Sequence, residues 1–328
     1  MKQTLAFALK AAVSAVLLYL ALRSVDLDLL SNRLSGLAPR WGVAAVLVLT
    51  IQVFLVALRW QRIAAACGAP VSRRDAALFT FVGMLFNQTL PSTVGGDAAR
   101  VWLLARAGGG WKNATYSVLI DRAAGLIWLA LLVLACLPWS LRLIENPVGR
   151  LTLVLIGIGG VAGPAALYAV TTTAGSVLSR WRATRHLKDL IAALGRVVAS
   201  PRSGSFIGAI TVTVHLMTVL AAWLLALSIG APLGLGHALL LIPPVVLIAA
   251  VPVSIAGWGV REGAMIAAFA SAGLPNADAV AVSVMLGLAN VVIGAGGGIA
   301  WMLVGRTLPL AAIERGARAA DGRGQSHY

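Results

Sequence analysis

Two short stretches of this sequence place an arginine near an acidic residue, just after a proline and glycines that would interrupt a helix. The first, NQTLPSTVGGDAAR, begins at Asn87 and contains Asp97 and Arg100. The second, VPVSIAGWGVREGA, contains Arg261 followed by Glu262. A guanidinium can bind a phosphate through two parallel hydrogen bonds, and a carboxylate can orient that guanidinium or bind an amine. We therefore predict that these residues bind a charged head group.

Each stretch follows an apolar run that it brings to an end. Proline removes a backbone donor and stops a helix, and glycine allows backbone geometries that other residues avoid. The helix that starts after such a break presents unpaired N–H groups and a positive dipole end, and we expect Asp97 to cap some of those amides. The predicted helix breaks are Pro91, Gly95, Gly96, Pro252, Gly257 and Gly259.

The two stretches align with each other as an internal repeat. When Pro91 is aligned with Pro252, Arg100 falls on Arg261, and a glycine precedes the arginine in both copies. An odd number of apolar spans separates the copies, so the second should enter the membrane from the opposite side. Paired broken helices of this kind are typical of transporter binding sites. We expect two inverted hairpins, at about residues 76–109 and 237–273.

Three further ionisable residues lie inside apolar segments. Asp121 could pair with Arg100 across the first hairpin or relay a proton, and Arg122 could instead reach the cytoplasmic surface. His215 is either a hydrogen-bonded helix contact or a proton carrier. The arginine–acid pairs of the hairpins also have a purely structural interpretation, in which each pair satisfies itself and holds its hairpin in place.

The composition indicates an all-α, polytopic membrane protein. Hydrophobic residues make up 59% of the 328 residues and charged residues only 11%, and several apolar stretches reach the length that spans a bilayer. We predict about six full spans plus the two hairpins, in a single membrane domain at 1–305 with a disordered basic tail at 306–328. Two G-x-x-x-G spacings, Gly159–Gly163 and Gly294–Gly298, predict close helix packing.

The net charge of +15 follows the distribution of basic residues in membrane proteins, which collect them in cytoplasmic loops. We assign Arg59, Arg62, Arg73 and Arg74 to the loop after the second span. This bias predicts cytoplasmic N- and C-termini in a bacterial inner membrane and argues against a nucleic-acid partner. We expect no cofactor and no metal, because the histidines lack metal-ligand spacing.

Two patterns resemble the lysylphosphatidylglycerol synthase transmembrane region. They are N-x-x-x-P-x-x-x-G-G-D-x-x-R from Asn87 and P-x-x-x-x-G-x-G-x-R-E from Pro252. This family is also called flippase-like, and the resemblance covers nearly the whole chain. It implies a membrane domain that moves a lipid between leaflets. The family's aminoacyltransferase domain is expected to be absent from this chain, and the resemblance does not fix the lipid.

We therefore predict a flippase-like transporter of a phospholipid or a lipid-linked polar head group, without enzymatic activity. One alternative is a membrane-embedded enzyme or accessory subunit of lipid or lipid-linked glycan biosynthesis, and another is a small-solute transporter. A homodimer and a lipid-biosynthesis enzyme partner stay open. A groove open sideways to the bilayer would indicate a lipid cargo, whereas a closed vestibule would indicate a solute.

Overall fold

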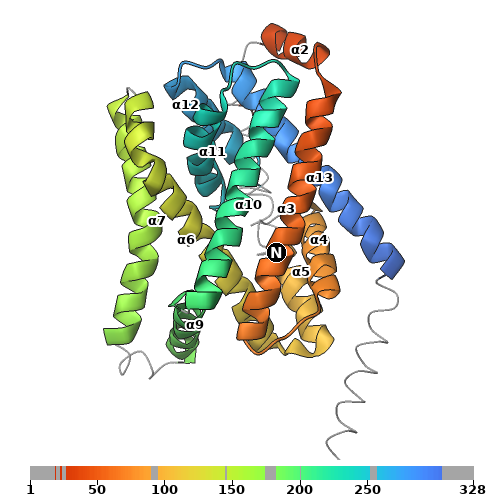
Figure 1. Cartoon of the computed structure of the whole chain (residues 1–328), viewed down its shortest axis with the longest axis vertical. Helices are drawn as coiled ribbons and strands as arrows, with labels where there is room; N and C mark the ends of the chain where they lie inside the picture. The colour runs from red at the N-terminus through yellow and green to blue at the C-terminus, as the bar shows by residue number, and fades with distance from the viewer. Residues whose placement is uncertain are drawn as a thin grey trace, which may run out of the picture.

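The computed structural model describes residues 27–89, 95–144, 146–173, 182–199, 201–251 and 257–304, together with Tyr19 and Arg23. The elements in these ranges are helices, which confirms the predicted all-α class (Figure 1). They are α2 (Leu27–Ser35), α3 (Pro39–Ala66), α4 (Arg73–Thr89), α5 (Gly95–Leu104), the π-helical η1 (Ala105–Gly109), α6 (Trp111–Leu143), α7 (Pro147–Thr173), α9 (Arg182–Ala199), α10 (Pro201–Ser228), α11 (Leu235–Ala249), α12 (Val260–Ser271) and α13 (Asn276–Val304).

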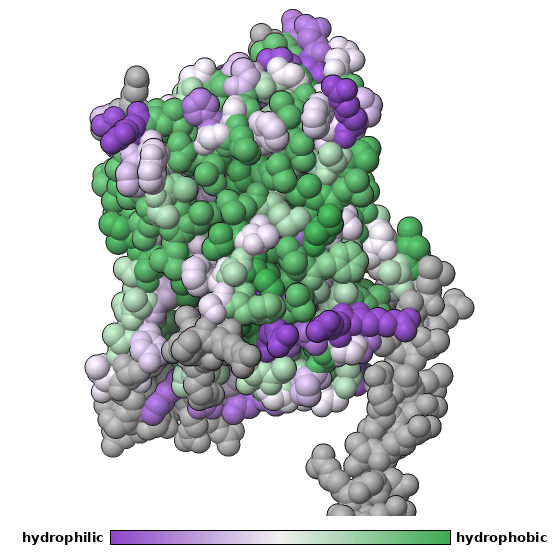
Figure 2. Space-filling view, viewed as in Figure 1, coloured by the Kyte–Doolittle hydropathy of each residue, from purple (hydrophilic) through white to green (hydrophobic). Residues whose placement is uncertain are grey.

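Within the described part of the chain, five helices are long and apolar enough to cross a membrane: α3, α6, α7, α10 and α13. Figure 2 shows the matching surface, which is hydrophobic over its middle, with hydrophilic residues near the two ends. The protein is therefore a multi-pass membrane protein. Most of the predicted first span, the basic tail and the predicted breaks at Pro91 and Pro252 lie outside the described residues.

The long helix α3 has one exposed apolar face and one buried face. Its apolar residues fall into an exposed stripe and a buried stripe at helical spacing, which is the pattern of a helix between lipid and a protein core. The exposed stripe is Val43, Leu47, Ile51 and Phe54, and the buried stripe is Ala45, Leu49, Val53 and Ala57. We infer that the exposed stripe faces the acyl chains.

The two interrupted segments form helix hairpins of opposite direction (Figure 1). The lower end of the molecule holds α9 and the α5–α6 junction, and the upper end holds α2 and the α10–α11 junction. From the lower end, α4 runs towards the middle and α5 returns, and from the upper end α11 runs towards the middle and α12 returns. This is the inverted arrangement that the aligned motifs predict.

The packing follows the same two-fold pattern. The orders α3–α4–α5–α6 and α10–α11–α12–α13 both consist of a long helix, two short helices and a long helix. The helices α3 and α10 pack on each other, α4 packs along α13, and α11 packs along α6. Each hairpin is therefore held by the long helix that closes the opposite repeat.

The glycine spacing in α13 marks a close helix contact, as predicted. A Cβ at Gly297 would overlap the carbonyl oxygen of Phe81 in α4, and one at Gly294 would lie 3.3 Å from the Leu85 backbone. For Gly159–Gly163 the described part of the chain shows no close contact, because a Cβ at either position would meet none of its atoms within 4 Å. In α7 the close approach to α6 is instead made by Gly157 and Gly160, which lie against Leu134 and Ala130.

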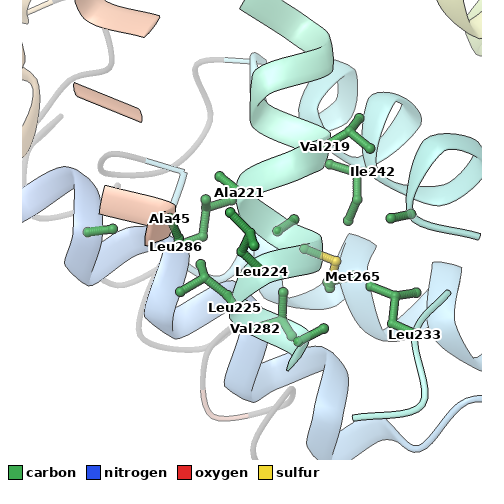
Figure 3. Packing of buried hydrophobic residues seen from close by; sticks show 14 of the residues in the cluster. Ala45, Val219, Ala221, Leu224, Leu225, Leu233, Ile242, Met265, Val282 and Leu286 are labelled. Carbon is green, nitrogen blue, oxygen red and sulfur yellow. The ribbon is translucent and has the colours of Figure 1, made fainter. Parts of the chain in front are cut away.

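A cluster of buried apolar side chains joins α10, α12 and α13, and we call it the upper core (Figure 3). Leu224 and Leu225 of α10 lie among Met265 of α12 and the α13 residues Val282 and Leu286. These side chains are 7% exposed or less. The upper halves of α10, α12 and α13 are therefore packed directly against one another.

The helices α2 and α9 were not predicted from hydropathy, because neither is an apolar segment that could cross a bilayer. At the upper end, Arg33 of α2 donates from Nε and Nη2 to the Asp278 carboxylate at 2.8 and 3.1 Å, and from Nη1 to the Gly230 carbonyl at 2.7 Å. These bonds tie α2 to α13 and to the α10–α11 turn. At the lower end, α9 packs against α6, α7 and α10.

Candidate functional site

The first hairpin places a buried arginine between two carboxylates. Arg100 of α5 donates from Nη2 to Asp97 Oδ1 at 2.8 Å and from Nη1 to Asp121 Oδ2 at 3.0 Å. All three residues are 8% exposed or less. The Arg100 guanidinium also lies over the Trp60 ring, 4.9 Å from its centroid, where a cation is attracted by the aromatic face. The predicted pairing of Asp121 with Arg100 is confirmed.

Two more arginines complete this ion-pair network. Arg59 of α3 donates from Nε to Asp121 Oδ1 at 2.8 Å and from Nη1 to Thr211 Oγ1 of α10 at 3.2 Å. Arg122 of α6 donates from Nε to Asp97 Oδ2. Each carboxylate is therefore bound by two guanidiniums, and the network joins α3, α5, α6 and α10. Charges removed from water are stable only when paired in this way.

The start of α5 is held against α4 by an amide and by close backbone contact. Asn87 Oδ1 accepts a hydrogen bond from the Gly96 N–H at 2.8 Å, so Asn87 caps an amide for which we had expected Asp97. Asp97 instead accepts from the two arginines. A Cβ at Gly96 would overlap the Gly83 carbonyl oxygen and lie 2.7 Å from the Asn87 side chain. Only glycine allows α5 to lie this close to α4.

A cavity of about 210 Å³ lies at this network. It is enclosed by α3, α4, α5, α6 and α13, and its polar lining combines the five charged side chains of the network with neutral amides and a hydroxyl. The lining residues are Leu49, Gln52, Val53, Val56, Arg59, Thr80, Gly83, Met84, Asn87, Gly96, Asp97, Arg100, Asp121, Arg122 and Asn290. We call this the hairpin cavity.

Arg122 is the most exposed charged side chain in the lining of the hairpin cavity. The side chain of Arg122 is 45% exposed, whereas those of Arg59 and Arg100 are 8% and 7% exposed. On α6 the exposed residues Leu119 and Leu126 share a face with Arg122, because residues three and four apart are neighbours on a helix. Arg122 lies roughly 16 Å along α6 from its first residue. We infer that the mouth of the cavity lies here, on a helix face whose neighbouring residues are apolar and exposed.

The second hairpin holds a smaller and self-contained set of contacts. Glu262 is fully buried and accepts from the Gly259 N–H at 2.6 Å, Ser283 Oγ at 2.7 Å and Arg261 Nη2 at 2.8 Å. Gly259 has a φ of 86°, a conformation that favours glycine. Arg261 lies over the Trp258 ring at 5.0 Å from its centroid. These contacts fit the structural interpretation, and neither Arg261 nor Glu262 lines the hairpin cavity.

The sequence was compared with models of known protein families. The family model described as the lysylphosphatidylglycerol synthase TM region matches residues 7–298. The chain belongs to this family. No curated protein matches the sequence. The resemblance that the paired motifs indicate is confirmed, and the match covers both hairpins of this lysylphosphatidylglycerol synthase TM-region protein.

His215 of this family member makes a helix-to-helix contact. His215 Nε2 lies 3.1 Å from the Gly125 carbonyl oxygen, which joins α10 to α6 near the ion-pair network. This contact matches the first of the two interpretations of His215.

One residue of the network was misplaced by sequence reasoning. Arg59 was assigned to a loop after the second span, but α3 continues to Ala66 and buries Arg59 to 6% exposure. The available signal was Trp60, since a tryptophan directly after the apolar run suggests that the helix continues. The structure brings together Asn87, Asp97, Arg100, Asp121 and Arg122 of the predicted residues, and adds Arg59.

Proposed function

We propose that this protein translocates a phospholipid or lipid-linked polar head group between the leaflets of the membrane, with the head group passing through the hairpin cavity. The observation that carries the proposal is the exposed Arg122 at the mouth of a charged cavity, on the same helix face as Leu119 and Leu126. A lateral opening of this kind suits a cargo whose acyl chains stay in lipid.

The energetic need for such a cavity supports the proposal. A charged group at the centre of a bilayer costs several kcal/mol or more when it has no partner. The hairpin cavity offers guanidiniums together with the amides of Gln52, Asn87 and Asn290. A head group that exchanges water for these donors avoids most of that cost, while its tails contact the apolar face of α6.

The basic residues at the lower end indicate from which side of the membrane the head group enters the cavity. Arg73 begins α4, and Lys112 is the second residue of α6. By the positive-inside rule we assign the lower end to the cytoplasm of a bacterial inner membrane. The upper core then lies towards the outer side of the membrane. We propose that the cavity is loaded from the cytoplasmic leaflet in this conformation.

We propose transport without covalent chemistry, because the carboxylates of the cavity are already engaged. A general base must be able to accept a proton from its substrate, but Asp97 and Asp121 each accept from two guanidiniums. Each of the four carboxylate oxygens therefore already faces a guanidinium.

Filling the cavity should stop lipid movement without changing charge. Val56 lines the hairpin cavity, so Val56→Trp is expected to lower the rate of lipid translocation about tenfold or more, because the indole occupies the space of the head group. The measurement is dithionite quenching of phospholipids labelled on an acyl chain, in vesicles that contain the purified protein.

The matched control is Val43→Trp on the same helix, at an exposed position of α3 (59% exposed). It should translocate lipid at the wild-type rate. Equal rates for wild type, Val56→Trp and Val43→Trp would show that the cavity is not the route, and a wild-type rate no higher than that of protein-free vesicles would refute translocation itself.

A further inference from the structure

We infer that the hairpin cavity selects an anionic phosphate-ester head group and rejects a head group that carries an additional amine. This inference rests on the proposed translocation and specifies its cargo. The family name refers to an aminoacylated lipid, so the inference separates this chain's cargo from the one that the name suggests.

The first argument is the charge of the cavity. Its lining contains three guanidiniums and two carboxylates among the described residues, a balance of +1. Interactions between charges are strong where little water is present. A head group with one negative charge neutralises this balance, whereas a lysyl ester of the same phospholipid would add positive charge to a site that is already positive.

The second argument is that no carboxylate of the network is left for an amine. Asp97 is bound by Arg100 and Arg122, and Asp121 by Arg59 and Arg100. An ammonium group has three donors and no acceptor, and to reach either acid it would have to lie against two guanidiniums of the same charge, which repel it. The buried Glu262 is equally occupied, by Gly259, Arg261 and Ser283.

The third argument is the position of Arg122. It is the most exposed guanidinium of the network, and it lies where the cavity meets the apolar face of α6. The phosphate of a membrane lipid, whose tails remain along that face, would meet Arg122 first. Because guanidinium and phosphate match in geometry, Arg122 is the residue that we assign to cargo selection, with Arg100 and Arg59 holding the acids in place.

The experiment compares head groups that differ only in charge. Vesicles of phosphatidylcholine with the full-length protein receive acyl-labelled phosphatidylglycerol, phosphatidylethanolamine or lysyl-phosphatidylglycerol, and dithionite quenching gives each rate. We expect phosphatidylglycerol to move about tenfold faster than its lysyl ester, since a charge-assisted hydrogen bond changes binding by about that factor or more. In Arg122→Gln, which removes one positive charge and releases an Asp97 oxygen, this preference should fall to about onefold or reverse.

The control is Lys112→Gln, which removes one positive charge from the same helix at an exposed position outside the cavity (56% exposed). It should keep the wild-type preference, and melting curves of both variants report whether they are folded. Lysyl-phosphatidylglycerol moving as fast as phosphatidylglycerol in the wild type would overturn the inference while leaving translocation intact, whereas no movement of any lipid would overturn the proposed function.

Soluble glycerol phosphate is added as a competitor. Inhibition at equal concentrations of competitor and lipid would identify a free phosphate ester as the ligand and would also overturn the inference.

Discussion

Replacing Asp121 with asparagine is expected to lower the free energy of unfolding by about 3–5 kcal/mol, the usual cost of leaving buried charges without their partner. Asp121 is 2% exposed and accepts from both Arg59 and Arg100. An asparagine keeps the shape of the side chain but provides only one oxygen and no charge. The two guanidiniums would then repel each other, and α3 and α5 would lose their common contact on α6.

Thermal or denaturant unfolding of the purified protein in detergent measures this loss. The double variant Arg59→Gln/Asp121→Asn should recover part of the stability, because it removes one positive charge together with the negative one. Asp189→Asn is the control, since Asp189 pairs with Lys112 at the surface with its side chain 45% exposed and should cost less than about 1 kcal/mol. An Asp121→Asn variant as stable as the Asp189→Asn variant would show that the network does not hold the helices together.

Replacing Gly96 with alanine should also destabilise the protein, for a different physical reason. The added methyl group would overlap the Gly83 carbonyl oxygen and press on the Asn87 side chain, so α5 would have to move away from α4. Such overpacking costs about 1–3 kcal/mol and sometimes more, and we expect the upper part of this range because one neighbour is backbone. The shift would also break the Asn87 cap and move Asp97 and Arg100, so lipid translocation should be lost as well.

Gly42→Ala is the matched control in α3, where a Cβ would meet no atom of the described residues within 4 Å. Alanine there should raise stability by about 0.5–1 kcal/mol through its higher helix propensity and leave translocation unchanged. If Gly96→Ala melted and translocated like Gly42→Ala, the close approach of α4 and α5 would not be needed for the site.

Sequence patterns predicted the hairpins and the short-range part of the network. Asp97 and Arg100 are three residues apart on one helix, so their contact follows from helix geometry alone. Asp121 was a reasonable partner because an ionised residue inside an apolar span needs a counter-charge. Both predictions depend on local rules, and the structure agrees with them.

The remaining features depend on tertiary packing, which hydropathy does not report. Arg59 lies just beyond an apolar run and was assigned to a loop, but α3 continues and places it against Asp121. Asn87 was predicted to bind the head group, yet the turn brings it to the Gly96 amide. Arg261 was predicted to bind the head group, but it does not line the hairpin cavity, and it contacts Glu262 and Ser283 within its own repeat. In each case the partner lies on a segment whose position the sequence alone does not give.

The most direct test of the account is to ask which side chains a lipid head group contacts. A phosphatidylglycerol analogue with a photoreactive diazirine on its glycerol head group can be cross-linked to the protein in vesicles and mapped by peptide mass spectrometry. The account predicts labelling of cavity residues such as Gln52, Val56 and Arg122, reduced by excess unlabelled phosphatidylglycerol. Labelling confined to the exposed stripe of α3, at Leu47 and Ile51, and unaffected by that competitor would contradict it.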